Sequence, residues 1–447
     1  MPTVAFHTLG CKVNFYDTEA IWQLFKNDGY EQVDFESQTA DVYVINTCTV
    51  TNTGDKKSRQ IIRRAVRRNP DAVIAVTGCY AQTSPAEILA IPGVDLVIGT
   101  QGRGEIIELV NRVRAEREPI NAVRNIMKTR QFEELDVPDF ADRTRAFLKI
   151  QEGCNNFCTF CIIPWSRGLL RSREPESVVK QAKMLVEAGY KEIVLTGIHT
   201  AGYGEDLENY NFAALLRDLE KVDGIERLRI SSIEASQITD EVIDVLMSSS
   251  KFCRHLHVPL QAGDDAVLKR MRRKYTVAEY AERIARIRER WPEVAITTDV
   301  IVGFPGETDE MFENGYRFMK DIGFSEMHVF PYSRRTGTPA ARMEDQVDEE
   351  LKNERVHKLI DLSEEMQLAY GQRFVGQTLE VIPEREAKGA EGQGLLSGYT
   401  DNYIQVVFPG DASLVGQLVQ VRVTEAGVNE CRGVRVETSA PLRAASF

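Results

Sequence analysis

Three cysteines between residues 154 and 161 have the type and spacing that most clearly indicate chemistry. Cys154, Cys158 and Cys161 form a C-x3-C-x2-C pattern directly after the apolar segment Phe147–Ile150. Cysteine thiolates hold iron–sulfur clusters, and a [4Fe–4S] cube usually takes four of them. A local run of three therefore predicts a cluster with one iron left open to a substrate or cofactor.

A zinc site and a set of buried thiols are the alternatives for this run. A structural zinc ion needs a fourth ligand nearby. No histidine lies between Lys149 and Ile198 to provide it. The spacing therefore favours the cluster over both alternatives.

A second set of cysteines is spread along the first 80 residues. Cys11, Cys48 and Cys79 each follow a short apolar segment, and these segments are Val4–Leu9, Val42–Asn46 and Val73–Thr77. Helical patterns separate the segments, near Thr18–Asn27 and Ser58–Arg68. Such alternation predicts a parallel sheet with helices on its faces. Since parallel strands end at one edge, the three cysteines should meet there and hold a second cluster. Three separate buried thiols remain the alternative.

The rest of the chain predicts further domains within its 447 residues. We expect an N-terminal α/β domain at 1–127, a polar linker at 128–144, a partial (β/α)6 TIM-like barrel at 145–371 and a small antiparallel β-barrel at 372–440. The barrel strands are expected at Ala146–Gln151, Glu192–Gly197, Arg227–Ile233, His255–Gln261, Ile296–Val302 and Met327–Tyr332. The C-x3-C-x2-C loop follows the first of these strands, where such barrels carry their chemistry.

Composition narrows the class of protein. No apolar run reaches the length of about 18 residues that a membrane span needs, and no signal peptide is visible. Eight cysteines in such a chain indicate ligands or free thiols in a reducing cytoplasm. The net charge of −12 argues against a non-specific nucleic-acid coat but leaves local RNA-binding patches open.

The motifs resemble those of one enzyme family. The segment 153–167 is similar to the cluster loop of radical S-adenosylmethionine enzymes, and the segments 8–14, 45–51 and 76–82 resemble the three cysteine motifs of the methylthiotransferases. The C-terminal module resembles a TRAM domain. Gly-Cys-Lys-Val-Asn at 10–14 and Thr-Cys-Thr-Val-Thr at 47–51 look most like the MtaB type, which methylthiolates N6-threonylcarbamoyladenosine beside the tRNA anticodon.

The resemblance implies roles for these residues. Cys154, Cys158 and Cys161 would hold a [4Fe–4S] cluster that binds S-adenosylmethionine, and Cys11, Cys48 and Cys79 an auxiliary cluster that carries the sulfur. No catalytic residue beyond these ligands is expected. Further cofactor-binding residues, implied by match to later strand ends, are Thr196, Gly197, Ser231, Glu234, Gln261 and Asp299.

The implied reaction replaces the hydrogen at carbon 2 of an adenine. This C–H group is too weakly acidic for a side-chain base to remove its proton. Two S-adenosylmethionine molecules would be used, one as the source of a 5′-deoxyadenosyl radical and one as the methyl donor. A reducing donor such as flavodoxin or ferredoxin would supply electrons. The alternatives are a methylthiotransferase acting on isopentenyl-adenosine tRNA or on a ribosomal protein, and a non-catalytic electron carrier or RNA-binding protein.

Basic clusters indicate where RNA would bind. One lies in a helical stretch and comprises Lys56, Lys57, Arg59, Arg63, Arg64, Arg67 and Arg68; the other comprises Lys269, Arg270, Arg272, Arg273 and Lys274. A solvated basic face is the alternative for both. For Arg167, Arg171 and Arg173 the alternatives are pairing with the cofactor or with RNA phosphate, or surface ion pairs with Glu174 and Glu176. Oligomeric state is left open.

Overall fold

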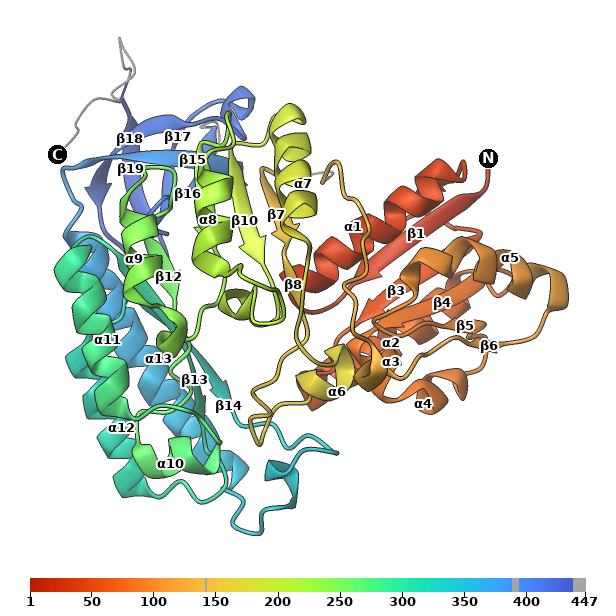
Figure 1. Ribbon diagram of the computed structural model, residues 1–447, viewed down its shortest axis with the longest axis horizontal. Coiled ribbons are helices and arrows are strands. Elements are labelled where there is room, and N and C mark those ends of the chain that lie inside the picture. Colours follow the sequence, from red (N-terminus) through yellow and green to blue (C-terminus); the bar gives the residue numbers. More distant parts are fainter. Residues whose placement is uncertain (141–142, 388–393, 437–447) are drawn as a thin grey trace.

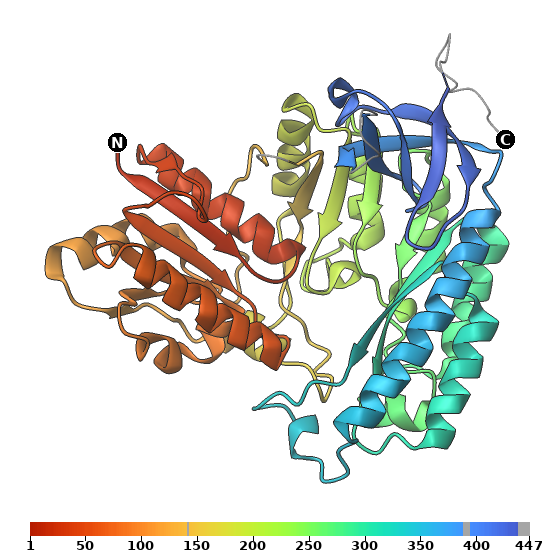
Figure 2. The same ribbon diagram turned by 180° about the vertical axis from the view of Figure 1, so that it is seen from behind.

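Three bodies of secondary structure make up the chain, as the sequence predicts. The computed structural model describes residues 1–140, 143–387 and 394–436. An N-terminal α/β domain lies beside a partial barrel of parallel strands, and a small closed barrel covers one end of those strands (Figures 1 and 2).

The N-terminal sheet is parallel throughout, with the strand order β2-β1-β3-β4-β5-β6. Helices α1 and α5 bury apolar side chains on one face of the sheet, while α2 and α4 cover the other face. The strands are β1 Thr3–Thr8, β2 Glu31–Gln32, β3 Val42–Thr47, β4 Val73–Gly78, β5 Leu96–Val97 and β6 Ile120–Asn121. The helices are α1 Lys12–Asn27, α2 Asn52–Arg68, α3 Cys79–Thr83, α4 Pro85–Leu89 and α5 Ile106–Glu116.

Two of these helices begin earlier than the sequence pattern predicts. Helix α1 begins at Lys12, and its first turns bury the polar residues Asn14 and Asp17, which break the expected apolar stripe. Helix α2 begins at Asn52, where the Thr51 hydroxyl accepts a hydrogen bond from the backbone N–H of Gly54 at 3.1 Å. Such a cap stabilises a helix by about 1 kcal/mol.

The central domain is a partial barrel of six parallel strands in the predicted order. Two sheets, β7-β10-β11 and β12-β13-β14, are joined by parallel bridges between Leu228 and Phe252 and between Ser232 and His257. The strands are β7 Arg145–Lys149, β10 Glu192–Thr196, β11 Arg227–Ile230, β12 His255–His257, β13 Ala295–Val302 and β14 Glu326–Pro331, and a short pair is formed by β8 Gln151–Glu152 and β9 Arg171–Ser172. The helices are α6 Ile163–Arg167, α7 Pro175–Glu187, α8 Phe212–Glu220, α9 Asp240–Met247, α10 Asp265–Arg270, α11 Val277–Arg290, α12 Asp309–Ile322 and α13 Glu349–Gln372.

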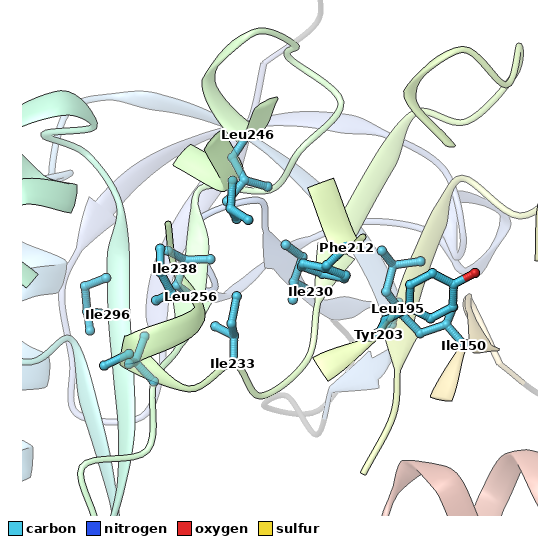
Figure 3. Close-up of a cluster of buried hydrophobic side chains, with 14 of the residues drawn as sticks. Ile150, Leu195, Tyr203, Phe212, Ile230, Ile233, Ile238, Leu246, Leu256 and Ile296 are labelled. Atoms are coloured by element: carbon cyan, nitrogen blue, oxygen red, sulfur yellow. The ribbon is translucent and has the colours of Figure 1, made fainter. Parts of the chain in front are cut away.

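One face of each barrel strand packs on the surrounding helices. Figure 3 shows Leu195, Ile230 and Leu256 from the strands gathered with Phe212 of α8, and all four side chains are at most 4% exposed. Burying each such side chain contributes about 1.5–3 kcal/mol. Because side chains alternate along a strand, the intervening residues of β12, β13 and β14 face the barrel interior.

The C-terminal barrel closes in the order β15-β16-β17-β19-β18. Four of its pairings are antiparallel, as expected, but β17 pairs with β19 in parallel. The strands are β15 Thr378–Ala387, β16 Leu395–Thr400, β17 Gln405–Pro409, β18 Val419–Glu425 and β19 Cys431–Arg435.

This small barrel closes the end of the partial barrel where the strands begin. Arg229 of β11 donates to the Thr400 carbonyl at 3.0 Å, and Arg254 donates to Asp401 at 2.7 Å. The ring of Tyr403 stacks on His255 of β12 with centroids 4.3 Å apart. The opposite end, where the strands finish and the cysteine loops lie, is the one that ligands can enter.

Candidate active site

The three N-terminal cysteines meet at one edge of the sheet, as predicted. Cys11 and Cys48 follow the adjacent strands β1 and β3, and Cys79 follows β4. The side-chain amide of Asn14 holds two of these loops together, since its Nδ2 donates to the Leu9 carbonyl at 2.6 Å and to the Thr47 carbonyl at 3.1 Å.

A glycine permits the close approach of two of these cysteines. Gly10 has φ +107°, and a Cβ atom there would lie only 3.1 Å from the Sγ of Cys48. Any larger residue would combine left-handed backbone strain with a clash against Cys48. The Gly10–Cys11 turn is therefore shaped to bring the loops of β1 and β3 together.

The second trio lies in the loop between β8 and α6. The backbone N–H of Cys161 donates to the Cys158 carbonyl at 3.0 Å, which turns the loop back on itself. Gly153 precedes the trio with φ +74°, and a Cβ atom there would lie 2.0 Å from the Leu169 carbonyl oxygen. Arg273 donates to the Sγ of Cys158 at 3.4 Å and places a positive charge beside this thiol.

Burial raises the pKa of several of these thiols in the metal-free protein. It raises the pKa of Cys48 and of Cys154 to about 11 and that of Cys161 to about 12, and it also raises the pKa of Cys79. Thiolates must form before iron binds, so cluster insertion should release protons.

One compact set of possible metal ligands lies outside both cysteine trios. Among the described residues, the one set of three ligand atoms that all lie within 4.8 Å of one another is His257, Asp299 and His328. Neither cysteine trio is drawn together that tightly, whereas three thiolates on one zinc ion at about 2.3 Å would be.

A cavity of about 170 Å³ lies beside the loop trio. Its lining includes Cys158, His199, Glu234 and Arg273. The Nδ1 of His199 lies 3.9 Å from the Sγ of Cys154, and its Nε2 contacts the Gln237 side-chain oxygen at 2.8 Å. Of the six expected cofactor-binding residues, Glu234 is the one that lines this cavity.

Of the other five expected cofactor residues, four lie at or beyond neighbouring strand ends, and Asp299 lies within β13. The Thr196 hydroxyl donates to the Val194 carbonyl at 3.2 Å, and the Ser231 hydroxyl contacts Thr200 at 2.9 Å. Gly197, Gln261 and Asp299 complete the set. A Cβ atom on Gly197 would lie 3.0 Å from the Gln151 side-chain oxygen, and Gln261 adopts φ +69°. Asp299 contacts two histidines in the barrel interior. The roles of these residues stay predictions.

A buried ion network joins the segment after the loop trio to the N-terminal domain. Arg167 follows the loop trio, is fully buried, and donates from Nε to the Sγ of Cys79 at 3.2 Å. Its Nη1 donates to Asp17 of α1 at 2.8 Å and to both oxygens of Glu152 at 3.1 Å. Lys149 donates to the other oxygen of Asp17 at 2.7 Å. One guanidinium therefore contacts an N-terminal cysteine, an N-terminal helix and the barrel.

The charges in this network hold one another in their ionised forms. Burial alone would raise the pKa of Asp17, but Arg103, Lys149 and Arg167 keep it far below its usual value. Glu152 is likewise held ionised, since Arg167 and Lys149 outweigh burial and lower its pKa. Removing a partner from a buried pair leaves an uncompensated charge, which is strongly destabilising.

Two of the expectations for the three arginines after the cluster loop were therefore wrong, namely surface ion pairs and contact with RNA phosphate, while pairing with the cofactor stays a prediction. Arg167, Arg171 and Arg173 are all at most 1% exposed, so they form neither surface ion pairs nor an RNA-facing patch. Arg173 pairs with Glu134 and Asp136 of the segment expected to be a polar linker. Sequence could not reveal this, because partners 37 to 150 positions apart meet only in the fold.

Replacing Arg167 with glutamine should destabilise the protein by about 3–5 kcal/mol, because Asp17 and Glu152 would lose their shared cation. Thermal unfolding of the metal-free protein checks this. Arg112→Gln is the matched control, since Arg112 is 51% exposed and, within the described part of the chain, pairs with Glu116 alone. The control should shift stability by no more than about 0.5 kcal/mol. Equal midpoints for the two variants would show that the network contributes little.

The N-terminal domain also contacts the far edge of the partial barrel. Arg335, after β14, donates to Asn52 at 2.7 Å, to Asp55 at 2.8 Å and to the Thr49 hydroxyl at 2.6 Å. Since Arg167 joins the domain near β7, contacts are made beside both edge strands. The N-terminal domain therefore lies across the open side of the barrel.

Two further charged residues near the barrel strands were not singled out from the sequence. His328 of β14 lies beside Asp299, and Lys12 begins α1. Protein around Lys12 removes much of its hydration and lowers its pKa to about 8, although its side chain is still accessible to solvent. The pairing of β13 with β14 places His328 directly opposite Asp299. This strand register is the feature that could have identified His328.

The fold and the cysteine loop define a radical S-adenosylmethionine enzyme. The profile of the Radical SAM superfamily matches residues 148–319, that of the TRAM domain residues 372–433, and that of uncharacterized protein family UPF0004 residues 3–99. A radical S-adenosylmethionine methyltransferase, TsrM from Kitasatospora setae, shares this fold with a TM-score of 0.56 at 17% identity, covering 76% of this chain and 74% of that one.

Curated relatives define the family more closely. Threonylcarbamoyladenosine tRNA methylthiotransferase MtaB of Bacillus subtilis (strain 168) is 66% identical, over 98% of this chain and 97% of its own length. A tRNA-2-methylthio-N(6)-dimethylallyladenosine synthase of Carboxydothermus hydrogenoformans is 38% identical, over 96% and 98%. The chain belongs to the MtaB-type radical S-adenosylmethionine methylthiotransferases, enzymes that transfer sulfur-containing groups. This family implies S-adenosylmethionine and a [4Fe–4S] cluster. Among the residues that the structure describes, no helix is both long and apolar enough to cross a membrane.

Proposed function

We propose that this enzyme methylthiolates carbon 2 of N6-threonylcarbamoyladenosine next to the anticodon of tRNA, with two [4Fe–4S] clusters and two S-adenosylmethionine molecules. The observation that carries the proposal is that Arg167, at the end of the helix that follows the loop trio, donates to Cys79 of the other trio. The 66% identical relative bears the corresponding name, whereas the dimethylallyladenosine synthase of Carboxydothermus hydrogenoformans is 38% identical. Methylthiolation of isopentenyl-type adenosine is therefore the second candidate.

In this proposal each trio holds one cluster. Cys154, Cys158 and Cys161 bind the cluster of the radical domain, and the auxiliary trio of the segment 1–127 binds the other. Together the bound clusters and S-adenosylmethionine supply an electron, a 5′-deoxyadenosyl radical, the sulfur and the methyl group. The residues of this chain bind, orient and shield these groups.

Two arginines place positive charge beside the proposed cluster ligands. Arg273 compensates the charge of the radical-domain cluster through Cys158, and it also pairs with Glu234. Arg167 does the same for the auxiliary cluster through Cys79. Charge-assisted hydrogen bonds to ligand sulfurs raise the reduction potential of a cluster. The reductant is a small donor such as flavodoxin or ferredoxin.

The RNA is proposed to approach along α2. Its side chains Lys56, Lys57, Arg63 and Arg67 are exposed, and the helix begins four positions after Cys48. Of the second basic cluster, Arg273 is buried beside Cys158 and Arg270 pairs with Asp345, so that cluster offers fewer free charges. In the TRAM-like segment 372–440, Tyr399 and Tyr403 stack on each other against the partial barrel, and Phe408 is a core residue.

The test is nucleoside analysis of tRNA treated with the reconstituted enzyme. Transfer RNA from a strain that lacks the gene should gain 2-methylthio-N6-threonylcarbamoyladenosine, and 5′-deoxyadenosine should accumulate with it. The same tRNA pool contains isopentenyl-type adenosines, so both candidate substrates compete in one assay. Methylthiolation of the isopentenyl-type nucleoside alone would overturn the assignment in favour of the second candidate.

A further inference from the structure

Two histidines and an aspartate meet on three adjacent strands of the partial barrel. They are His257 of β12, Asp299 of β13 and His328 of β14. One nitrogen of each ring and one oxygen of the carboxylate all lie within 4.8 Å of one another. The group contains no cysteine, so it is chemically distinct from the two proposed cluster sites.

The strand register brings these three side chains together. His328 lies directly opposite Asp299, and His257 lies opposite Thr297, two positions before Asp299. Because side chains alternate along a strand, Thr297 and Asp299 point to the same face of β13. The group is therefore carried by paired strands, which position side chains more precisely than loops do.

The distances within the group suit ligands of one metal ion. The Nε2 of His257 lies 3.2 Å from one oxygen of Asp299, and the Nδ1 of His328 lies 3.2 Å from the other. Two ligand atoms at about 2.1 Å from an ion are about 3.0–3.4 Å apart when the angle between them is 90–110°. Hydrogen bonds have similar lengths, so the surroundings of the two rings must be considered as well.

Each ring has a polar partner on its other nitrogen. The Nδ1 of His257 lies 2.9 Å from the hydroxyl of Thr297, and the Nε2 of His328 lies 3.5 Å from the carboxylate of Glu326. Histidines that bind metals use their second nitrogen in this way, which fixes the orientation of the ring. Both rings are thus oriented with the first nitrogen toward the shared carboxylate.

The donor set and its exposure indicate which ion would bind. The side chains of His257, Asp299 and His328 are 15%, 30% and 43% exposed, so an ion can reach them from solvent. Two imidazoles suit zinc and similar transition metals, whereas magnesium and calcium prefer oxygen ligands alone. Three protein ligands also leave a coordination position open to water or to another oxygen ligand.

We propose that His257, Asp299 and His328 bind one zinc ion inside the partial barrel, separately from both clusters. The proposal does not depend on which adenosine the enzyme modifies. In the metal-free protein, hydrogen bonds to Asp299 and Glu326 raise the pKa of His328 to about 9. Zinc must therefore displace a proton from this ring, and a mildly alkaline solution favours its binding.

The experiment is a calorimetric titration of zinc chloride into the anaerobically reconstituted enzyme at pH 8, with the cysteines occupied by clusters. The ligand variants are His257→Gln, His328→Gln and Asp299→Asn, which keep side chains of similar size. The controls are His357→Gln and Asp361→Asn, since both residues are exposed on α13. Iron content of the same samples shows that each variant is folded and holds its clusters.

We expect the wild type and both controls to bind one zinc ion per chain with equal affinity. Each ligand variant should bind zinc at least about 10- to 100-fold more weakly, since even the groups that orient a ligand contribute that much. X-ray absorption at the zinc edge should show nitrogen and oxygen at about 2.0–2.2 Å and no sulfur at about 2.3 Å.

Three results would overturn the inference. The first is a wild-type enzyme that takes up no zinc, which would leave the group as a set of hydrogen-bonded ion pairs. The second is sulfur in the zinc coordination shell, which would place the ion on cysteines. The third is unchanged zinc affinity in any iron-replete ligand variant.

Discussion

A variant with alanine at Cys11, Cys48 and Cys79 should retain about half of the wild-type iron after anaerobic reconstitution, since one of two cubes would remain. It should still cleave S-adenosylmethionine to 5′-deoxyadenosine, because the loop trio is intact. It should form no methylthiolated nucleoside. The measurement is an iron and sulfide count together with analysis of both products from one reaction.

The physical reason lies in the separation of the two trios. Cys11, Cys48 and Cys79 follow β1, β3 and β4, whereas the loop trio belongs to the barrel domain. The cysteines of one trio can therefore be replaced while those of the other trio stay in place. The matched control is Cys253→Ala, which removes a buried thiol near Arg229 and outside both trios. The control should keep its full iron and both products. Loss of 5′-deoxyadenosine from the triple variant, with iron still at half, would contradict separate roles for the two trios.

Replacing Cys158 with alanine should abolish 5′-deoxyadenosine and methylthiolated product together, a loss of at least about a thousandfold, because radical formation depends on the cluster that binds the cofactor. Cys158 is the loop cysteine that contacts Arg273 and lines the 170 Å³ cavity. About half of the iron should remain, now on the auxiliary trio.

The control for this second variant is Cys431→Ala, in the small C-terminal barrel. Cys431 is buried in the core of that barrel and lies outside both trios. Iron and both products should match the wild type. If Cys158→Ala still produced 5′-deoxyadenosine at a rate near that of the wild type, the loop trio would not be the site of radical formation.

Local patterns were sufficient to predict the fold and the meeting of the cysteines. Strand–helix alternation predicts a parallel sheet, and a parallel sheet brings Cys11, Cys48 and Cys79 to one edge whatever lies between them. The early start of α1 was missed because Asn14 and Asp17 interrupt its apolar stripe. Their burial depends on Arg167 and Lys149, which lie more than 130 positions away. Sequence periodicity carries no sign of such a partner.

The arrangement of the domains was also beyond the sequence. A β-rich tail predicts a small barrel, but not that its Tyr403 stacks on His255 and closes one end of the larger barrel. The packing of α1 near β7 follows from how the N-terminal domain docks, through contacts such as Arg335 with Asp55. Docking is determined by side chains distributed over the whole chain. The motifs therefore predicted the chemistry, whereas the way the domains pack against one another could be seen only in the structure.

The most direct test of the central claim is a crystal structure of the anaerobically reconstituted enzyme with anomalous scattering recorded at the iron edge. We expect two separate iron peaks, one on the sulfurs of Cys11, Cys48 and Cys79 and one on those of Cys154, Cys158 and Cys161. Arg167 should lie against the first peak and the S-adenosylmethionine cavity against the second. A single iron peak, or iron at two places that do not face a common space, would contradict the account.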